Sequence, residues 1–297
     1  MRAKWTDLAV EACKSASKSD TERLACGIER LTVRIDNERD AQAMGRPCGV
    51  YVTLTCPQAM SIALKTRQAL ARELAMTLRS MLPKARKSIL VVGLGNRNVT
   101  PDSLGPRTAE RILVTRHMAG CLPEDMAQSM ASVSAAAPGV LGVTGMETVE
   151  ILKGMVTHVQ PDAVIAIDAL AARSSSRIAS TIQIADTGIT PGSGVGNHRK
   201  ALNEQTLGVP VIAVGVPLVV YASTIASDAL YALGGGDEER IAACVEQVVS
   251  LKLGEMVVTP REVDALVERM SGVLADGINQ ALQPNLTSVE IAQMMAQ

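Results

Sequence analysis

The chain has 297 residues, of which 47 % are apolar and 20 % charged, as is usual for a folded globular protein. Its 29 basic and 30 acidic residues give a net charge of −1, and 1 % of the residues are aromatic. Direct nucleic-acid binding is not expected, because the chain has neither a basic excess nor enough stacking side chains. No apolar run is long enough to span a membrane, which predicts a soluble, intracellular protein.

The cysteines are scattered, with neither a Cys-x-x-Cys pair nor a close set of histidines. They are Cys13, Cys26, Cys48, Cys56, Cys121 and Cys244. Such spacing is typical neither of a zinc site nor of a compact disulfide framework. We therefore expect reduced thiols in a cytosolic compartment, and neither a bound metal nor a cofactor.

The first part of the chain is predicted to be α+β. Apolar and polar residues alternate over 31–35 and over 50–54, which is the period of half-buried strands. The segment 57–82 has apolar residues near helical spacing and stops before Pro83, so it is predicted to form one helix.

From residue 88 onward, short apolar runs alternate with helical segments. Strands are predicted over 88–94, 129–136, 163–167, 181–184 (at an edge) and 209–216, and helices over 106–117 and 144–158. Strands that are apolar throughout are typical of a parallel sheet covered on both faces. A last helix is predicted to open at Thr259-Pro260-Arg261-Glu262, which combines a capping box with a proline in the first turn.

The predicted fold class is therefore α/β: a mostly parallel sheet covered by helices on both faces, with an N-terminal α+β elaboration and C-terminal helices. We find neither an internal repeat nor a long linker, so residues 8–297 are predicted to be one domain. The elaboration spans 8–87, and the α/β core with its C-terminal helices spans 88–297.

Sites in open parallel sheets lie beyond the carboxyl ends of the strands, which draws attention to three loops. The first, 93–106, shares two glycines with dinucleotide-binding loops, but Asn98 stands at the third glycine position and a Walker lysine is missing. The loop does carry Asp102 just before a predicted helix. That carboxylate is either a helix-terminal acid favoured by the helix dipole or a functional group, and the residues alone leave both open.

The second loop follows the apolar run 163–167 and begins with Asp168, a structural acid or, as its position favours, a catalytic or ligand-binding one. The third, 186–199, has four glycines around Ser193 and faces solvent, substrate or another subunit. It lacks the G-x-S-x-G pattern of a nucleophile elbow. Histidine-assisted nucleophilic catalysis would depend on His198, so a carboxylate mechanism is favoured.

Several segments together resemble the germination proteases of endospore-forming bacteria, which degrade small acid-soluble spore proteins. They include Thr-Asp-Leu-Ala-Val-Glu-Ala at 6–12, Met-Gly-Arg-Pro at 44–47, Gly-Leu-Gly-Asn at 93–96 and Val-Thr-Pro-Asp-Ser-Leu-Gly-Pro at 99–106. They continue with 138–148, Ile-Asp-Ala-Leu-Ala-Ala-Arg at 167–173, Pro-Gly-Ser-Gly-Val-Gly-Asn at 191–197 and Val-Val-Thr-Pro at 257–260. The resemblance covers nearly the whole chain.

This resemblance implies an endopeptidase of an atypical aspartic type, similar in fold to the hydrogenase maturation proteases. The two essential acids of the family correspond to Asp102 and Asp168. One carboxylate would activate water as a general base, and the other, protonated, would polarise the scissile carbonyl and donate to the leaving amine. Two neighbouring carboxylates push their pKa values apart, which supplies one acid and one base.

The resemblance also implies a substrate cleft, for which the residues expected to hold the substrate backbone are Gly93, Gly95, Asn96, Gly192, Ser193, Gly194, Gly196 and Asn197. It further implies a self-processing zymogen, a homotetramer and a place in the forespore or spore core. Because the substrates are cut between an acid and an apolar residue, self-cleavage is expected between Asp7 and Leu8, which makes 1–7 a candidate propeptide and 8–297 the protease domain. Tyr221 stands where an aspartate of the family is expected.

Three alternatives stay open at this point. A hydrogenase maturation-type protease would use the equivalent acids on nickel in its substrate, with His198 as the candidate for a third ligand. A non-enzymatic α/β module binding a nucleotide or metabolite would not need the two acids. A hydrolase using Ser193 or a cysteine would respond to serine- or thiol-directed inhibitors.

Overall fold

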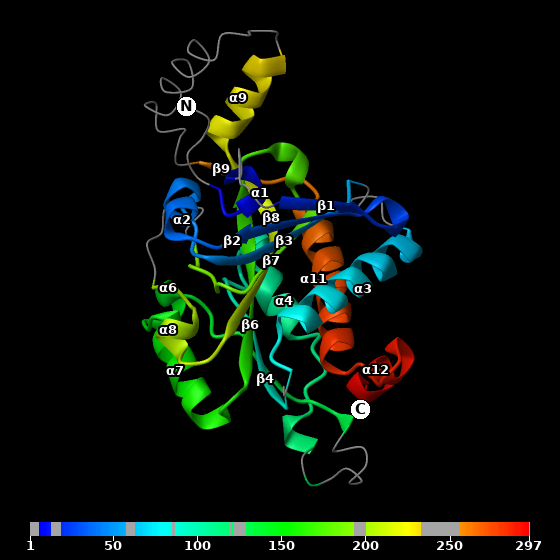
Figure 1. The fold of residues 1–297 in the computed structure, drawn as a ribbon. Coiled ribbons are helices and arrows are strands. Elements are labelled where there is room, and N and C mark those ends of the chain that lie inside the picture. Colours follow the sequence, from blue (N-terminus) through cyan, green and yellow to red (C-terminus); the bar gives the residue numbers. More distant parts are fainter. Residues whose placement is uncertain are drawn as a thin grey trace.

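The computed structural model describes residues 6–12, 19–57, 63–84, 87–118, 120, 129–192, 200–232 and 256–296. Within these residues nine strands form one sheet, in the order β1-β2-β3-β7-β8-β6-β4-β5, with β9 paired to β8 (Figure 1). The strands are β1 (Ser19–Arg23), β2 (Glu29–Ile35), β3 (Gly49–Thr55), β4 (Ser88–Gly93), β5 (Ser132–Ala136), β6 (Ala163–Ala172), β7 (Thr181–Ala185), β8 (Val211–Tyr221) and β9 (Val257–Val258).

The sheet has a parallel and an antiparallel half. Strands β5, β4, β6 and β8 run parallel to one another, whereas β8, β7, β3, β2 and β1 pair antiparallel in turn. The predicted α/β class is confirmed, and the parallel sheet predicted from residue 88 onward forms one half of a mixed sheet. The prediction that 181–184 is an edge strand is wrong, because β7 lies between β3 and β8 and joins the N-terminal strands to the core.

Helices cover both faces of the sheet, as the sequence predicts. The α-helices are α1 (Ala9–Ala12), α2 (Glu38–Met44), α3 (Leu64–Met81), α4 (Leu104–Ala109), α6 (Leu141–Thr144), α7 (Thr148–Val159), α8 (Glu204–Leu207), α9 (Ala222–Ala232), α11 (Val263–Leu282) and α12 (Ser288–Met295). Helices α3 and α11 pack against one face and form the main core. On the other face, α7 and α8 cover the parallel half, while α1 and α2 pack over the antiparallel half (Figure 1).

The elements follow their sequence patterns most closely where burial is regular. Leu70, Leu74 and Leu78 recur at intervals of four on α3 and are almost fully buried. Each such leucine contributes about 1.5–3 kcal/mol by leaving water, so the amphipathic pattern is a strong signal. The part of the predicted first helix over 58–62 lies outside the described residues.

Three predicted boundaries are wrong. The helix predicted over 106–117 is α4, Leu104–Ala109, after which Thr115 turns the chain toward β5 by donating its N–H to Val133 O at 3.0 Å. The helix predicted over 144–158 begins at Thr148 as α7, because Gly145 adopts a left-handed conformation and the capping box is formed by Glu147 and Glu150. The last helix begins at Val263, because Thr259 Oγ1 donates to Leu218 O at 2.8 Å and does not cap it.

Two of the compositional expectations can be compared with the structure. Among the described cysteines, Cys26, Cys48 and Cys56 are thiols outside any disulfide, and the other three lie outside these residues. In the part of the chain that the structure describes, none of the helices combines the length and the apolar character needed to cross a membrane.

Candidate active site

The loop after β4 places Asp102 at the carboxyl edge of the parallel strands. The loop is tied to β6, because Leu94 N donates to Ile167 O at 2.8 Å. Asp102 closes a short 3-10 helix, η3 (Thr100–Asp102), and its Oδ2 accepts a hydrogen bond from Asn96 N at 2.7 Å. The 93–106 loop therefore folds back on itself and fixes the direction of the Asp102 carboxylate.

Glycines make this fold-back possible. Gly95 has φ of +107°, and a Cβ atom there would lie 2.1 Å from Asp102 O and 2.9 Å from Asp102 Oδ1. Gly93 has a different function, since a Cβ there would lie 2.1 Å from Gly105 O, where α4 crosses the end of β4. Of the five glycines expected to hold substrate, Gly93 and Gly95 thus keep the strand-to-helix junction and Asp102 in place.

Asp168 lies inside β6 and not after a strand as predicted, because β6 continues to Ala172 by pairing with β8. Its side chain points to the same face of the sheet as Ala166, which packs on the α7 side. Asp168 is 5 % exposed, and its Oδ1 accepts a hydrogen bond from Ala169 N at 2.9 Å. The carboxylate is therefore held at the sheet surface by its own strand.

Asp102 and Asp168 line one cavity of about 250 Å³, and Asp7 lines it too. Its apolar walls include Val99, Pro101, Val140, Val219 and Val257. Of the residues expected to hold substrate, Gly95 and Gly192 line this cavity, whereas Gly93 and Asn96 do not. Ser193, Gly194, Gly196, Asn197 and His198 lie outside the described residues. Two acids that are far apart in the sequence thus line the same cavity as a third.

The segment that carries Asp7 and Leu8 is bound to the end of β6 and to the middle of β7. Asp7 N donates to Ala171 O at 2.9 Å, and Asp7 Oδ2 accepts from Ala171 N at 2.8 Å. Asp7 O accepts from Gln183 Nε2 at 2.8 Å, and Gln183 Oε1 accepts from Ala9 N at 2.5 Å. Leu8 is fully buried in the main core. The predicted cleavage site is therefore held in one defined conformation.

Glu11 anchors the same segment a few residues further on. Its carboxylate accepts from Arg173 N at 2.6 Å and from Ser174 N at 2.9 Å, and Arg177 Nε lies 3.5 Å away. Its side chain is 7 % exposed, so these charge-assisted bonds are shielded from solvent. The motifs at 6–12 and 167–173, which carry the family resemblance, are thus in direct contact.

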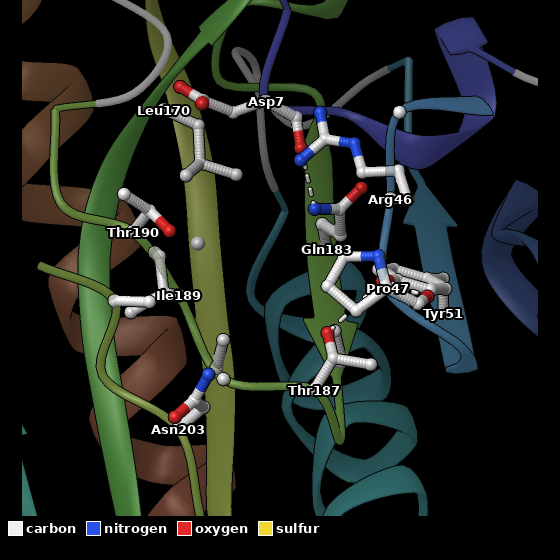
Figure 2. Close-up of a pocket in the computed structure, with 16 residues that line it drawn as sticks. Asp7, Arg46, Pro47, Tyr51, Leu170, Gln183, Thr187, Ile189, Thr190 and Asn203 are labelled. Carbon is white, nitrogen blue, oxygen red and sulfur yellow. Dashed lines mark hydrogen bonds between the residues drawn. The ribbon is translucent and has the colours of Figure 1, made fainter. Parts of the chain in front are cut away.

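The Met-Gly-Arg-Pro motif at 44–47 contacts the segment from the other side. Arg46 donates to Thr6 O, and Tyr51 Oη donates to Pro47 O at 2.8 Å. Arg46, Pro47 and Tyr51 line a second cavity of about 230 Å³, shown in Figure 2, in which the Gln183 amide points toward Asp7. Asp7 and Leu170 line both cavities, so they lie between them.

Tyr221, at the end of β8, stands near the same segment. It is 7 % exposed, and burial raises the pKa of its phenol, which the negative charge of Asp7 raises further. The phenol is therefore neutral throughout the physiological range. The aspartate expected from the family resemblance would place a second negative charge close to Asp7, whereas Tyr221 supplies a hydroxyl group.

The described residues contain no group of three or more His, Cys, Asp or Glu side chains arranged to hold a metal ion. His198, the candidate third ligand of the metal-guided alternative, is outside them.

Comparison with known proteins decides which protease family this is. Residues 10–235 match the family model described as germination protease. The chain belongs to the germination protease family. It is accordingly a peptidase, and the family and the endopeptidase activity predicted from the sequence motifs are confirmed.

Relatives match over nearly the whole chain. The germination protease of Caldanaerobacter subterraneus subsp. tengcongensis is 42 % identical over 98 % of this chain and 97 % of its own. That of Clostridium acetobutylicum is 41 % identical over 98 % of both, and that of Bacillus cytotoxicus 39 % identical over 93 % of both. Among solved structures, the [NiFe] hydrogenase maturation protease HycI from Thermococcus kodakarensis aligns with 68 % of this chain and 98 % of its own, at 18 % identity and a TM-score of 0.37.

The sequence did not single out Gln183, nor give a role to Arg46 or Glu11. Arg46 and Glu11 belong to motifs that carry the resemblance, but their contacts join segments far apart in the chain. Gln183 had one visible signal, since it is a polar residue between two isoleucines in a strand.

Proposed function

We propose that this endopeptidase starts the degradation of small acid-soluble spore proteins during germination, cutting after an acidic residue. In this proposal Asp102 and Asp168 act as a general acid–base pair on water. The observation that carries it is the shared cavity: two acids from separate elements line it together with Asp7, the acid of a candidate cleavage site in the same chain. Membership of the germination protease family supports the substrate class.

The proposed reaction needs one proton on the pair of acids. The ionised carboxylate takes a proton from water, whose oxygen attacks the carbonyl carbon of the acidic residue before the scissile bond. The protonated carboxyl group donates to the leaving amine as the C–N bond breaks, which restores one proton on the pair. Hydrogen bonds from Asn96 N to Asp102 and from Ala169 N to Asp168 orient the two groups.

We further propose that the chain is a zymogen that cuts itself between Asp7 and Leu8. The segment is fixed on both sides of that bond, by Ala171 at Asp7 and by Gln183 at Asp7 and Ala9. Holding a bond next to the reacting groups converts its cleavage into a unimolecular step, which is worth several orders of magnitude in rate. A homotetrameric assembly and a location in the spore core complete the proposal, on the basis of the family resemblance.

The test is incubation of the purified chain with a small acid-soluble spore protein, with cut sites determined by mass spectrometry. Cleavage after an acidic residue by the wild type, lost in both Asp102→Asn and Asp168→Asn, supports the proposal. Circular dichroism of each variant establishes that the fold is kept. A variant that cuts at the wild-type rate would remove its acid from the mechanism.

A further inference from the structure

Gln183 is a buried carboxamide whose two ends both bind the N-terminal segment. Its Nε2 donates to Asp7 O at 2.8 Å (Figure 2). Its Oε1 accepts from Ala9 N at 2.5 Å, so the side chain bridges Leu8. The residue is 9 % exposed and comes from the centre of the sheet, 176 residues from Asp7. Asp7 O is the carbonyl oxygen of the bond proposed to be cut.

The sheet register places this amide on the same side as one of the two acids. Gln183 pairs with Gly215 across β7 and β8, and Gly215 pairs with Asp168 across β8 and β6. Directly paired residues point to the same face, so Gln183 and Asp168 face the same side, about two strand spacings or ~10 Å apart. The residue between them is a glycine, so this row has side chains only at its two ends.

Asp7 lies beside this row, next to Leu170, whose side chain packs over Gly215. It is bound to β6 through the backbone of Ala171 and to β7 through Gln183, and it lines the cavity that holds Asp102 and Asp168. In this arrangement Gln183 donates to the carbonyl oxygen from β7, and the two acids act from the side of β4 and β6. Acyl transfer requires a donor to the oxygen together with acid and base groups placed in this way.

We propose that Gln183 is a catalytic residue of the self-cleavage, donating through Nε2 to the scissile carbonyl oxygen while Oε1 holds the N–H of the second residue beyond the bond. This inference rests on the proposed function and adds a third group to it. When water attacks the Asp7 carbonyl carbon, the electron pair of the C=O bond moves onto the oxygen, where the Gln183 N–H meets the developing charge. As the electron pair returns, the C–N bond breaks and the Leu8 amine takes a proton from the carboxylic acid.

A carboxamide at this position has a consequence for specificity. Both of its bonds are to backbone atoms, so Gln183 recognises an extended peptide by its spacing and not by its side chains. The acid before the bond is bound separately, by Ala171 N. We therefore expect Gln183 to affect the rate of cutting at every site, and the Ala171 contact to affect the choice of an acidic residue.

The test is the first-order rate of cutting between residues 7 and 8 in the full-length chain, measured by intact mass. Gln183→Glu keeps the shape but replaces the donor by a carboxylate, and Gln183→Met keeps the length without any hydrogen bond. We expect each to lower the rate at neutral pH by about 10²–10³-fold, as for the loss of an oxyanion donor. The rate of Gln183→Glu relative to the wild type should rise as the pH falls, because the protonated acid can donate again, whereas that of Gln183→Met should not.

A matched control exists in the same chain. Gln283 is 1 % exposed, and it also bridges backbone atoms, with Nε2 donating to Ala131 O at 2.9 Å and Oε1 accepting from Ala131 N at 3.2 Å. It lines neither cavity. Gln283→Glu should lower the melting temperature but leave the rate of cutting unchanged, which separates catalysis from the cost of burying a carboxylate.

The outcomes separate this inference from the proposed function. Wild-type rates in folded Gln183→Glu and Gln183→Met, with cutting abolished in Asp102→Asn, would overturn the role of Gln183 alone. A wild-type chain that never cuts after Asp7, or an Asp102→Asn variant that cuts normally, would overturn the proposed function and this role with it. Equal losses in Gln183→Glu at every pH would mean that Gln183 only supports the fold.

Discussion

Replacing Gly95 by alanine should disable the site while leaving the fold in place. The new Cβ would lie 2.1 Å from Asp102 O, whereas ordinary contact begins at 3.4 Å, so the Asp102 backbone must retreat by more than 1 Å. A displacement of about 1 Å at a reacting group costs on the order of 10²-fold in rate. The φ of +107° adds strain of about 1–3 kcal/mol for any residue other than glycine.

The assay is the rate of cleavage of a small acid-soluble spore protein, together with the melting temperature. We expect the rate to fall by about 10²-fold and the melting temperature by roughly 2–12 °C, since 1 kcal/mol corresponds to about 2–4 °C in a domain of this size class. Gly154→Ala is the control, because Gly154 lies in α7 with nothing within 4 Å of a Cβ added there. This substitution should raise the free energy of unfolding by about 0.5–1 kcal/mol and leave the cleavage rate unchanged. A Gly95→Ala protein with wild-type rate and stability would refute the argument that this turn holds Asp102.

Two further predictions concern pH. Burial and the charge of Asp7 both raise the pKa of Tyr221, so Asp7→Asn should lower the titration midpoint of this phenol. The midpoint is measured by ultraviolet absorbance and assigned to Tyr221 with Tyr221→Phe. An unchanged midpoint would contradict an electrostatic interaction between Asp7 and Tyr221. Hydrogen bonds from the Thr287 backbone and hydroxyl lower the pKa of Glu290 from 4.5, so its contribution to α12 is present above the unfolded value and is lost as the pH falls through the folded one. The protection factors of the α12 amides, which correct hydrogen exchange for its intrinsic pH dependence, should therefore fall on acidification in the wild type and depend less on pH in Glu290→Gln.

Much of the core and both acids could be predicted from the sequence, because each depends on local pattern. The apolar runs that become β4, β6 and β8 need no partner to be recognised as buried strands. Asp102 stands out as an acid in the loop after the first of these runs, and Asp168 as the acid that directly follows the run 163–167, although β6 continues beyond it. Their assignment as the two essential acids comes from the family resemblance. Their shared cavity agrees with that reasoning, and their catalytic role stays a prediction.

The sequence could not predict what depends on long-range order. The alternation of Thr181–Ala185 favours an edge strand with one face in water, but both faces of β7 are buried. Gln183 faces the N-terminal segment and not solvent, which requires a contact across 176 residues. Similarly, Thr259 satisfies a carbonyl of β8 and does not cap a helix, because the nearest acceptor in space is remote in sequence.

The measurement that tests the central claim most directly is a double-mutant cycle on the two acids. Cleavage of a small acid-soluble spore protein is measured for the wild type, Asp102→Asn, Asp168→Asn and the double variant, each shown to be folded. Groups that act as a unit are not additive, so each single variant should lose about as much activity as the double one. Independent, multiplying losses, or a single variant that keeps the wild-type rate, would contradict a two-carboxylate mechanism.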